Sequence, residues 1–380
     1  MHGTITTEVQ APTLADSKVQ RLSFFVFSLF FIFGSITSLN DVLIPKLKHL
    51  FSLSYAEAML VQSSFFLAYF IVSIPAGLLI TRIGYMRAAT VGLLTMAAGS
   101  LLFIPATQVG MFVAFLGALF VLASGVTIVQ VVANPLILLL GCSSTAHSRV
   151  TFAHAFNSLG TTVAPYLGAI LILGTLNDVD PSVLPASALT AFLAQEAKVI
   201  SNTYAGIALA LFVVAVMVWQ QRKQLPANTR PERSNPLAAL SLLKRPRFSL
   251  GAACLFFYVG AEVAIGSVLT NFLMQTSTFG FDPETAGKHV AFYWGGAMVG
   301  RFIGAALLRI FAPGKLLSCA ASTVIVLITV AASAQGPLAG WTILAIGLFN
   351  SVMFPTLFAL ASECSGQLIP DTTLSFSSAR

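Results

Sequence analysis

Two carboxylates interrupt stretches of this chain that are otherwise apolar. Asp41 stands at the end of the first long apolar run, and Glu262 lies well inside a later one. A charged side chain at the centre of a bilayer costs roughly 2.5 kcal/mol or more, so such groups are usually retained for handling an ion or a substrate. Both are therefore candidate cation-coupling residues. The alternative for Asp41 is a place at the outer interface, with its side chain reaching water.

Neutral polar side chains recur in other apolar runs at helical spacing. Thr127, Gln130 and Asn134 share one helix face. Amides and carboxylates can both satisfy the many hydroxyl groups of a sugar, because each hydroxyl donates and accepts hydrogen bonds. The alternative is that single amides only bond a neighbouring helix, which is typically worth about 0.6 kcal/mol. The candidate substrate-binding set is Gln130, Asn134, Asn157, Glu262 and Asn350.

Two further ionisable groups lie inside apolar runs. His154 is better explained as a packed or hydrogen-bonded histidine than as a proton relay. Arg301 either pairs with an acid, reaches the cytoplasmic side, or takes part in function. The sequence contains no nucleotide-binding loop, metal-ligand constellation or hydrolytic triad, so neither an enzyme nor a bound cofactor is predicted.

Composition assigns the chain to the membrane. It is 57% hydrophobic and only 9% charged, whereas soluble domains carry about 25% charged residues. The net charge of +7 does not indicate nucleic-acid binding, because the basic residues lie in loops between apolar runs. The predicted environment is a lipid bilayer.

Ten apolar segments are long enough to cross that bilayer, since a membrane helix needs about 20 apolar residues. The fold class is therefore an all-α membrane protein. The predicted spans are 22–44, 58–80, 87–107, 111–139, 150–173, 203–220, 248–273, 289–311, 316–334 and 337–361.

The basic residues set orientation and organisation. With the N-terminus in the cytoplasm, 14 lysines and arginines fall on the inner side and 4 on the outer side, as the positive-inside rule requires. Residues 221–247 are rich in basic residues and proline and are predicted to be a cytoplasmic linker. The predicted regions are a cytoplasmic segment 1–21, a six-span bundle 22–220, this linker, a four-span bundle 248–361 and a polar tail 362–380.

The two halves of the chain resemble each other. The second span is preceded by Ser54 and Glu57, a predicted capping box, and the eighth by Asp282 before a proline. A parallel repeat of two bundles is the plan of the major facilitator superfamily, with the substrate site between the repeats. Small residues at every fourth position, Gly160 to Gly168 and Gly296 to Gly304, predict close helix contacts that suit rocking of one bundle on the other.

Several short runs resemble the fucose permease family of major facilitator transporters, and most closely its bacterial glucose/galactose transporter branch. The resemblance covers roughly residues 22–361. Its runs are Leu39-Asn40-Asp41, Gln62-Ser63, Pro75-Ala76-Gly77, Gly125 through Pro135, Ala155 through Gly160, Tyr258 through Val263, Trp294 through Arg301, and Gly347 through Pro355.

The resemblance implies import of a hexose across the inner membrane, driven by a cation gradient. In fucose-specific relatives, an acid in the first span and a glutamate in the fourth are linked to proton coupling. Asp41 matches the first, but Gln130 stands at the second, so that role does not carry over. Glu262 is the branch's own intramembrane acid. Whether H⁺ or Na⁺ is the coupled ion stays open.

The family has twelve spans, whereas this sequence matches it only to about Ala361. The tail from Ser362 to Arg380 is polar, so we expect a second bundle that is incomplete, with four helices. The leading prediction is a sugar:cation symporter working by alternating access. The alternatives are an inactive truncated transporter, a non-transporting sensor, or a transporter of another small polar solute such as fucose.

Overall fold

The structure is a computed structural model that describes residues 16–51, 53–140, 145–168, 185–223, 242–281 and 283–363. Within these residues every long element is an α-helix. In chain order they are α1 (Asp16–Phe51), α2 (Tyr55–Ile83), α3 (Tyr85–Val109), α4 (Phe112–Leu139), α5 (Ala146–Gly168), α6 (Ala186–Gln220), α8 (Pro246–Met274), α9 (Pro283–Leu307), α10 (Pro313–Ser333), α11 (Pro337–Asn350) and α12 (Met353–Glu363), with a short 3₁₀ turn at Leu242–Lys244.

Local signals at the helix ends behave as the sequence predicts. Ser54 caps α2: its backbone N–H donates to the Glu57 carboxylate at 2.8 Å, and the Glu57 N–H donates to the Ser54 hydroxyl at 3.3 Å. The bonds that the Ser54 backbone N–H and hydroxyl donate to the carboxylate, both 2.8 Å, lower the pKa of Glu57, because they favour its charged form. Pro283 opens α9, and Asp282, the predicted cap, lies outside the described residues.

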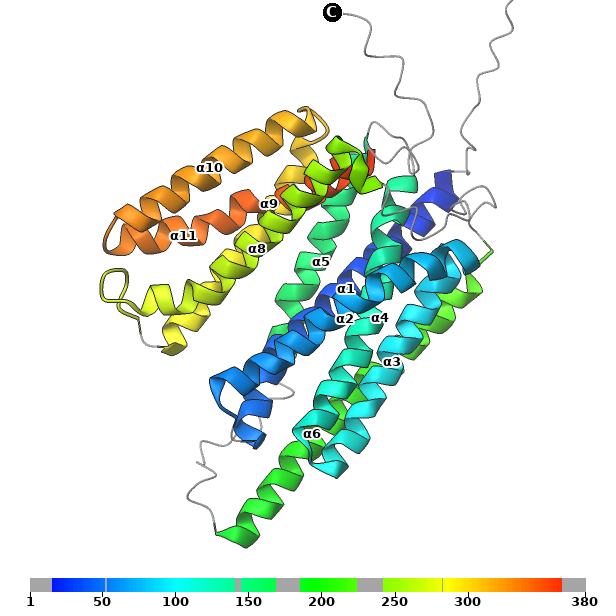
Figure 1. Ribbon diagram of the computed structural model, residues 1–380, viewed down its shortest axis with the longest axis vertical. Helices are drawn as coiled ribbons and strands as arrows, with labels where there is room; N and C mark the ends of the chain where they lie inside the picture. The colour runs from blue at the N-terminus through cyan, green and yellow to red at the C-terminus, as the bar shows by residue number, and fades with distance from the viewer. Residues whose placement is uncertain are drawn as a thin grey trace, which may run out of the picture.

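The helices form two groups, each with its own hydrophobic core (Figure 1). The first core is built from α1 to α6, where α3 packs on α4 and α6, and α2 packs on α4. The second is built from α8 to α11. Across the boundary α5 packs against both α1 and α9. The exact limits of the two regions stay a prediction.

Nine helical stretches of the described residues are long and apolar enough to cross a membrane, and they match nine of the ten predicted spans. The exception is the predicted span 150–173. Its helix α5 has 23 residues, about 34 Å at 1.5 Å per residue, but it carries His147, Arg149 and His154 in or near its first half. Packing between α1 and α9 accounts for this polarity, because α5 turns much of its surface to protein.

The last predicted span, 337–361, is not one continuous helix. The α-helical pattern stops at Asn350 and resumes at Met353, with Ser351 and Val352 in a turn. Pro355 lies in the first turn of α12, where a proline is tolerated because it removes no helical hydrogen bond. The break matters because it sits among the polar side chains described below.

The two helices with small-residue faces, α5 and α9, meet across the bundle boundary as predicted, but their glycines make the closest contacts inside their own groups. Rocking at this boundary stays a prediction. A Cβ atom at Gly160 would collide with the carbonyl of Phe31 on α1, and one at Gly300 would collide with the carbonyl of Leu348 on α11. The physical reason is that α5 packs on α1, and α9 on α11, with the two backbones so close that only glycine fits between them. Only Gly304 also approaches the opposite group, with the Thr151 methyl 3.7 Å from its virtual Cβ.

Candidate functional site

Neutral amides and one histidine form a polar cluster in the first bundle. The Asn134 amide of α4 donates to the backbone carbonyl of Gln130 at 3.1 Å, and its Oδ1 lies 3.2 Å from Nε2 of His154 on α5. His154 is 4% exposed and lies edge-on between Phe30 and Phe354, with ring centroids 4.9 and 5.2 Å away. His154 is thus held as a hydrogen-bonded, packed side chain, and its ring meets both bundles.

Asn157 lies one turn further along α5 and faces α1. Its amide donates to the carbonyl of Phe30 at 3.3 Å, and its close approach to α1 requires glycine at position 34. Its hydrogen bond therefore ties α5 to α1. The side chain is half-buried, so part of its amide group remains accessible to a solute.

A second polar cluster surrounds the break between α11 and α12. The Tyr258 hydroxyl of α8 donates to the carbonyl of Asn350 at 3.0 Å, and the Asn350 amide donates to the Tyr293 hydroxyl of α9 at 2.8 Å. Asn350 is 3% exposed, and among the described residues its Oδ1 has no hydrogen-bond partner. A buried acceptor left open in this way suits a hydrogen-bond donor from outside the protein.

Glu262 belongs to this second cluster. It lies one turn after Tyr258 on α8, so the two side chains share a helix face and the Tyr258 hydroxyl acts on the carboxyl group. The positive charge of Arg301 acts on it as well. The structure therefore joins Glu262 to Asn350 through Tyr258.

Arg301 of α9 connects the two clusters. Its Nε donates to the carbonyl of Ser351, in the helix break, at 3.3 Å. Its Nη1 donates to the Ser158 hydroxyl and, at 3.5 Å, to the carbonyl of His154. The side chain is only 8% exposed, so this buried cation is held by oxygen atoms from both bundles.

A second link between the bundles lies nearer the start of α5. The Ser148 hydroxyl donates to the Ala305 carbonyl at 2.6 Å and accepts from Nε of Arg309 at 3.3 Å. Phe152 and Phe302 meet edge-on in the same interface. These contacts and those of Arg301 use residues 148–158 of α5, the second half of α9 and the turn that follows α9.

The structure brings four of the predicted binding residues into two groups: Gln130 with Asn134, and Glu262 with Asn350. Asn157 stands beside the first group but bonds to α1. Asp41 lies within α1, while its side chain lies outside what the structure describes, so its role stays a prediction. No cluster of three or more metal-ligating side chains occurs in the described part of the chain.

Three residues central to the site were not in the predicted binding set: Tyr258, Tyr293 and Arg301. Tyr258 could have been found from its spacing, because residues four apart share a helix face and it precedes Glu262 by four. Arg301 was recognised as a charged residue inside an apolar run, but nothing in the sequence identified the carbonyl groups to which it donates. Tyr293 carries no comparable sequence signal.

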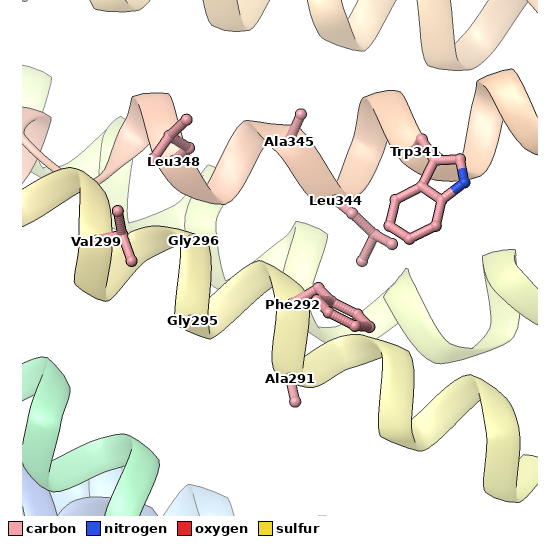
Figure 2. Close-up of a pocket in the computed structure, with 9 residues that line it drawn as sticks. All are labelled: Ala291, Phe292, Gly295, Gly296, Val299, Trp341, Leu344, Ala345 and Leu348. Atoms are coloured by element: carbon pink, nitrogen blue, oxygen red, sulfur yellow. The ribbon is translucent and has the colours of Figure 1, made fainter.

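An apolar groove between α9 and α11 is separate from this site (Figure 2). Its volume is about 430 Å³, and Phe292, Leu344 and Trp341 lie between the two helices. None of the predicted binding residues lines it, and its lining offers few polar atoms for a sugar. The lining residues are Ala291, Phe292, Gly295, Gly296, Val299, Trp341, Leu344, Ala345 and Leu348.

Comparison with known protein families identifies the family to which this chain belongs. The model of the Major Facilitator Superfamily matches residues 25–368. This chain belongs to the major facilitator superfamily. It is accordingly a multi-pass membrane protein of a transporter family and not an enzyme. Its all-α architecture is that of the superfamily.

Two curated relatives show the similarity in sequence. The chain is 48% identical over 333 residues to a protein of Brucella abortus biovar 1 (strain 9-941) named "Glucose/galactose transporter", a match covering 88% of this chain and 78% of the relative. It is 31% identical over 351 residues to the "L-fucose-proton symporter" of Escherichia coli (strain K12), covering 90% of this chain and 79% of that one. The predicted resemblance to the fucose permease family is thereby confirmed.

A solved structure shows the similarity in space. A major facilitator transporter, FucP, crystallised "in the outward conformation", superposes with a TM-score of 0.82 at 28% identity, covering 92% of this chain and 87% of that one. A more distant structure, the proton:xylose symporter XylE, superposes at 0.61 with 13% identity, covering 93% and 87%, and so supports the fold alone.

Proposed function

We propose that this chain is a secondary active transporter that imports a hexose, glucose or galactose, across the inner membrane together with a cation. The observation that carries the proposal is the pair of polar clusters on facing bundles, joined by Arg301. The names of its relatives, glucose/galactose transporter and L-fucose-proton symporter, support a sugar as the solute. The predicted cytoplasmic N-terminus belongs to the same proposal.

The neutral cluster is suited to bind sugar. Asn134 has donor and acceptor atoms in one amide, and Gln130 adds a second, half-buried amide one turn away. On the facing bundle the open Oδ1 of Asn350 can accept a sugar hydroxyl. Asn157 and Glu262 complete the proposed binding set. A site shared by two bundles would let sugar binding change their relative position.

The charged cluster is suited to couple the cation. Glu262 lies one turn after Tyr258, whose hydroxyl bonds to a carbonyl at the helix break, and gain or loss of a proton or Na⁺ there would change the charge facing Arg301. Asp41 is the second proposed coupling carboxylate, at the outer end of the first span. H⁺ and Na⁺ are both compatible with two carboxylates, because both cations bind to carboxylate oxygens.

Uptake of labelled galactose by cells without their own hexose carriers tests this proposal. The wild-type chain is compared with Asp41→Asn and Glu262→Gln, with and without sodium, at two external pH values. Concentrative uptake that both variants lose would support the coupling role, and the ion dependence would identify the driver. Glu57→Gln, which makes the same carboxylate-to-amide change on the exposed capping residue, is the matched control.

The opposite results are equally informative. If both variants keep full accumulation, the coupling role is wrong. If membrane-inserted wild-type chain takes up neither galactose nor glucose, competition with fucose and other small polar solutes tests a different substrate. Sugar binding without any flux would favour the sensor.

A further inference from the structure

The two carbonyl groups at the break between α11 and α12 are held by side chains from two different helices. Tyr258 of α8 donates to the carbonyl of Asn350 at 3.0 Å. Arg301 of α9 donates to the next carbonyl, that of Ser351, at 3.3 Å. A break in a helix exposes backbone groups that need partners away from water. These two side chains therefore stabilise the break in its present form.

Tyr258 has two acceptors but only one hydrogen. Its hydroxyl donates to the Asn350 carbonyl at 3.0 Å, and the second acceptor is the Glu262 carboxyl, four residues further along α8, which acts on the same hydroxyl. Tyr258 is 8% exposed, so water offers little replacement for a lost hydrogen bond. A phenolic hydroxyl donates once and can accept as well.

We propose that Tyr258 is a positioning residue that transmits the state of Glu262 to the break between α11 and α12. When Glu262 is charged, its carboxylate can only accept, and a charge-assisted bond is the stronger one, so it draws the tyrosine hydrogen away from Asn350. When Glu262 is neutral, it can donate to the tyrosine oxygen, and the hydrogen stays on the Asn350 carbonyl. The neutral state thus holds the break to α8.

The consequence reaches the boundary between the bundles. The neighbouring carbonyl, Ser351, is bonded to Arg301, which is also bonded to Ser158 and to the His154 carbonyl on α5. The charged and titratable groups that act on Glu262 are Tyr258 on its own helix, and Arg301 and Tyr293 on α9. The charge of Arg301 also acts on His154 of α5. A change at Glu262 is therefore carried through the break to the α5–α9 contact.

This inference rests on the proposed coupling role of Glu262, but it can be tested without any transport. The measurement is amide hydrogen exchange of residues 350–356 in purified protein in lipid nanodiscs, at one fixed pH. Glu262→Gln keeps a neutral side chain that can donate to Tyr258. Because one hydrogen bond is worth about 0.5–1.5 kcal/mol, exchange of this segment is expected to be roughly 3- to 10-fold slower in Glu262→Gln than in wild type.

Two tyrosine variants make the result specific. Tyr258→Phe removes the shared hydroxyl, so the difference between wild type and Glu262→Gln is expected to vanish in its background. Tyr293→Phe is the matched control, because it removes a hydroxyl bonded to the side chain of Asn350 and not to its carbonyl, and the difference is expected to persist. A difference that survives Tyr258→Phe, or that is absent with Tyr258 present, overturns the inference.

Galactose transport by Tyr258→Phe provides the functional test. The expected result is loss of accumulation against a gradient, while exchange of labelled for unlabelled sugar stays within about 3-fold of wild type. Normal accumulation in this variant would contradict the inference. If wild type does not transport galactose, the proposed function fails, while the exchange experiment still decides the role of Tyr258.

Discussion

The polar groups of the first bundle pair with one another, whereas those of the second bundle hold a broken helix. In the first, Asn134 bonds to His154 and to its own helix, and α4 and α5 are continuous there. In the second, Tyr258 and Arg301 bond to the carbonyls where α11 ends. Two bundles of similar plan thus differ in what their polar groups stabilise: a surface on continuous helices in one, and a break between two helices in the other.

The difference suggests a division of labour. Neutral amides on continuous helices can hold a sugar in one geometry. Charged groups around a break respond to an added cation, because a change of one charge changes several hydrogen bonds at once. The second bundle is therefore where we expect the larger share of coupling, with Asp41 of α1 as the second coupling carboxylate, and the first is where we expect the larger share of substrate selectivity.

The largest expected effect comes from removing the cation that joins the two regions. Arg301→Gln loses the charge that holds Ser351 and α5 together, and each hydrogen bond to a charged group is worth about 1.5–3 kcal/mol. We expect the initial rate of sugar uptake to fall about 100-fold, with a lower melting temperature in detergent. Arg222→Gln is the control, because Arg222 is partly exposed and bonds to the end of its own helix.

A smaller effect is expected at the open acceptor of the second bundle. Asn350→Ala removes the Oδ1 proposed to accept a sugar hydroxyl and also the donor to Tyr293. We expect the KM for sugar uptake to rise about 10-fold, because one or two hydrogen bonds are lost. An unchanged KM would place the sugar entirely against the first bundle.

The first bundle can be tested by a double-mutant cycle on its central pair. Asn134→Ala and His154→Ala each leave a buried polar atom without its partner. We expect the two changes to be non-additive by about 1 kcal/mol in the free energy of unfolding, because they break the same hydrogen bond. Additive effects would mean that the pair does not stabilise this surface.

The smallest effect is expected away from both clusters. Ser148→Ala removes the bond from α5 to the Ala305 carbonyl and the acceptor for Arg309. We expect the rate of sugar exchange to change only about 2- to 5-fold, because two hydrogen bonds between the bundles are lost while those of Arg301 remain. Ser28→Ala, which removes a bond within α1, should leave the rate unchanged.

The sequence predicted the helices well because apolar length is a strong signal in a membrane. It placed nine spans, the α2 capping box and the start of α9. It did not predict the break after Asn350, because the residues on both sides are equally apolar. Pro355 indicates a disturbance of the helix nearby, but it does not show at which residue the helix ends. The glycine faces were found, but the helices they pack against depend on packing that spacing does not specify.

The site was predicted in part for a similar reason. Polar residues in apolar runs identified Asn134, Glu262 and Asn350, since such residues are costly unless they have partners. Their partners are largely backbone carbonyls, as for Arg301 with Ser351 and Tyr258 with Asn350. Every residue has such a carbonyl, so no residue type in the sequence could reveal which one is used.

The division of labour between the bundles is tested most directly by measuring sugar exchange and gradient-driven accumulation side by side in proteoliposomes, for Glu262→Gln and Asn134→Ala. Glu262→Gln is expected to lose accumulation but to keep exchange at a raised KM, because the amide still offers hydrogen bonds to the sugar but carries no titratable charge for coupling. Asn134→Ala is expected to lose both, because the binding surface itself is damaged. Accumulation that persists in Glu262→Gln, or exchange that persists in Asn134→Ala, would contradict the division.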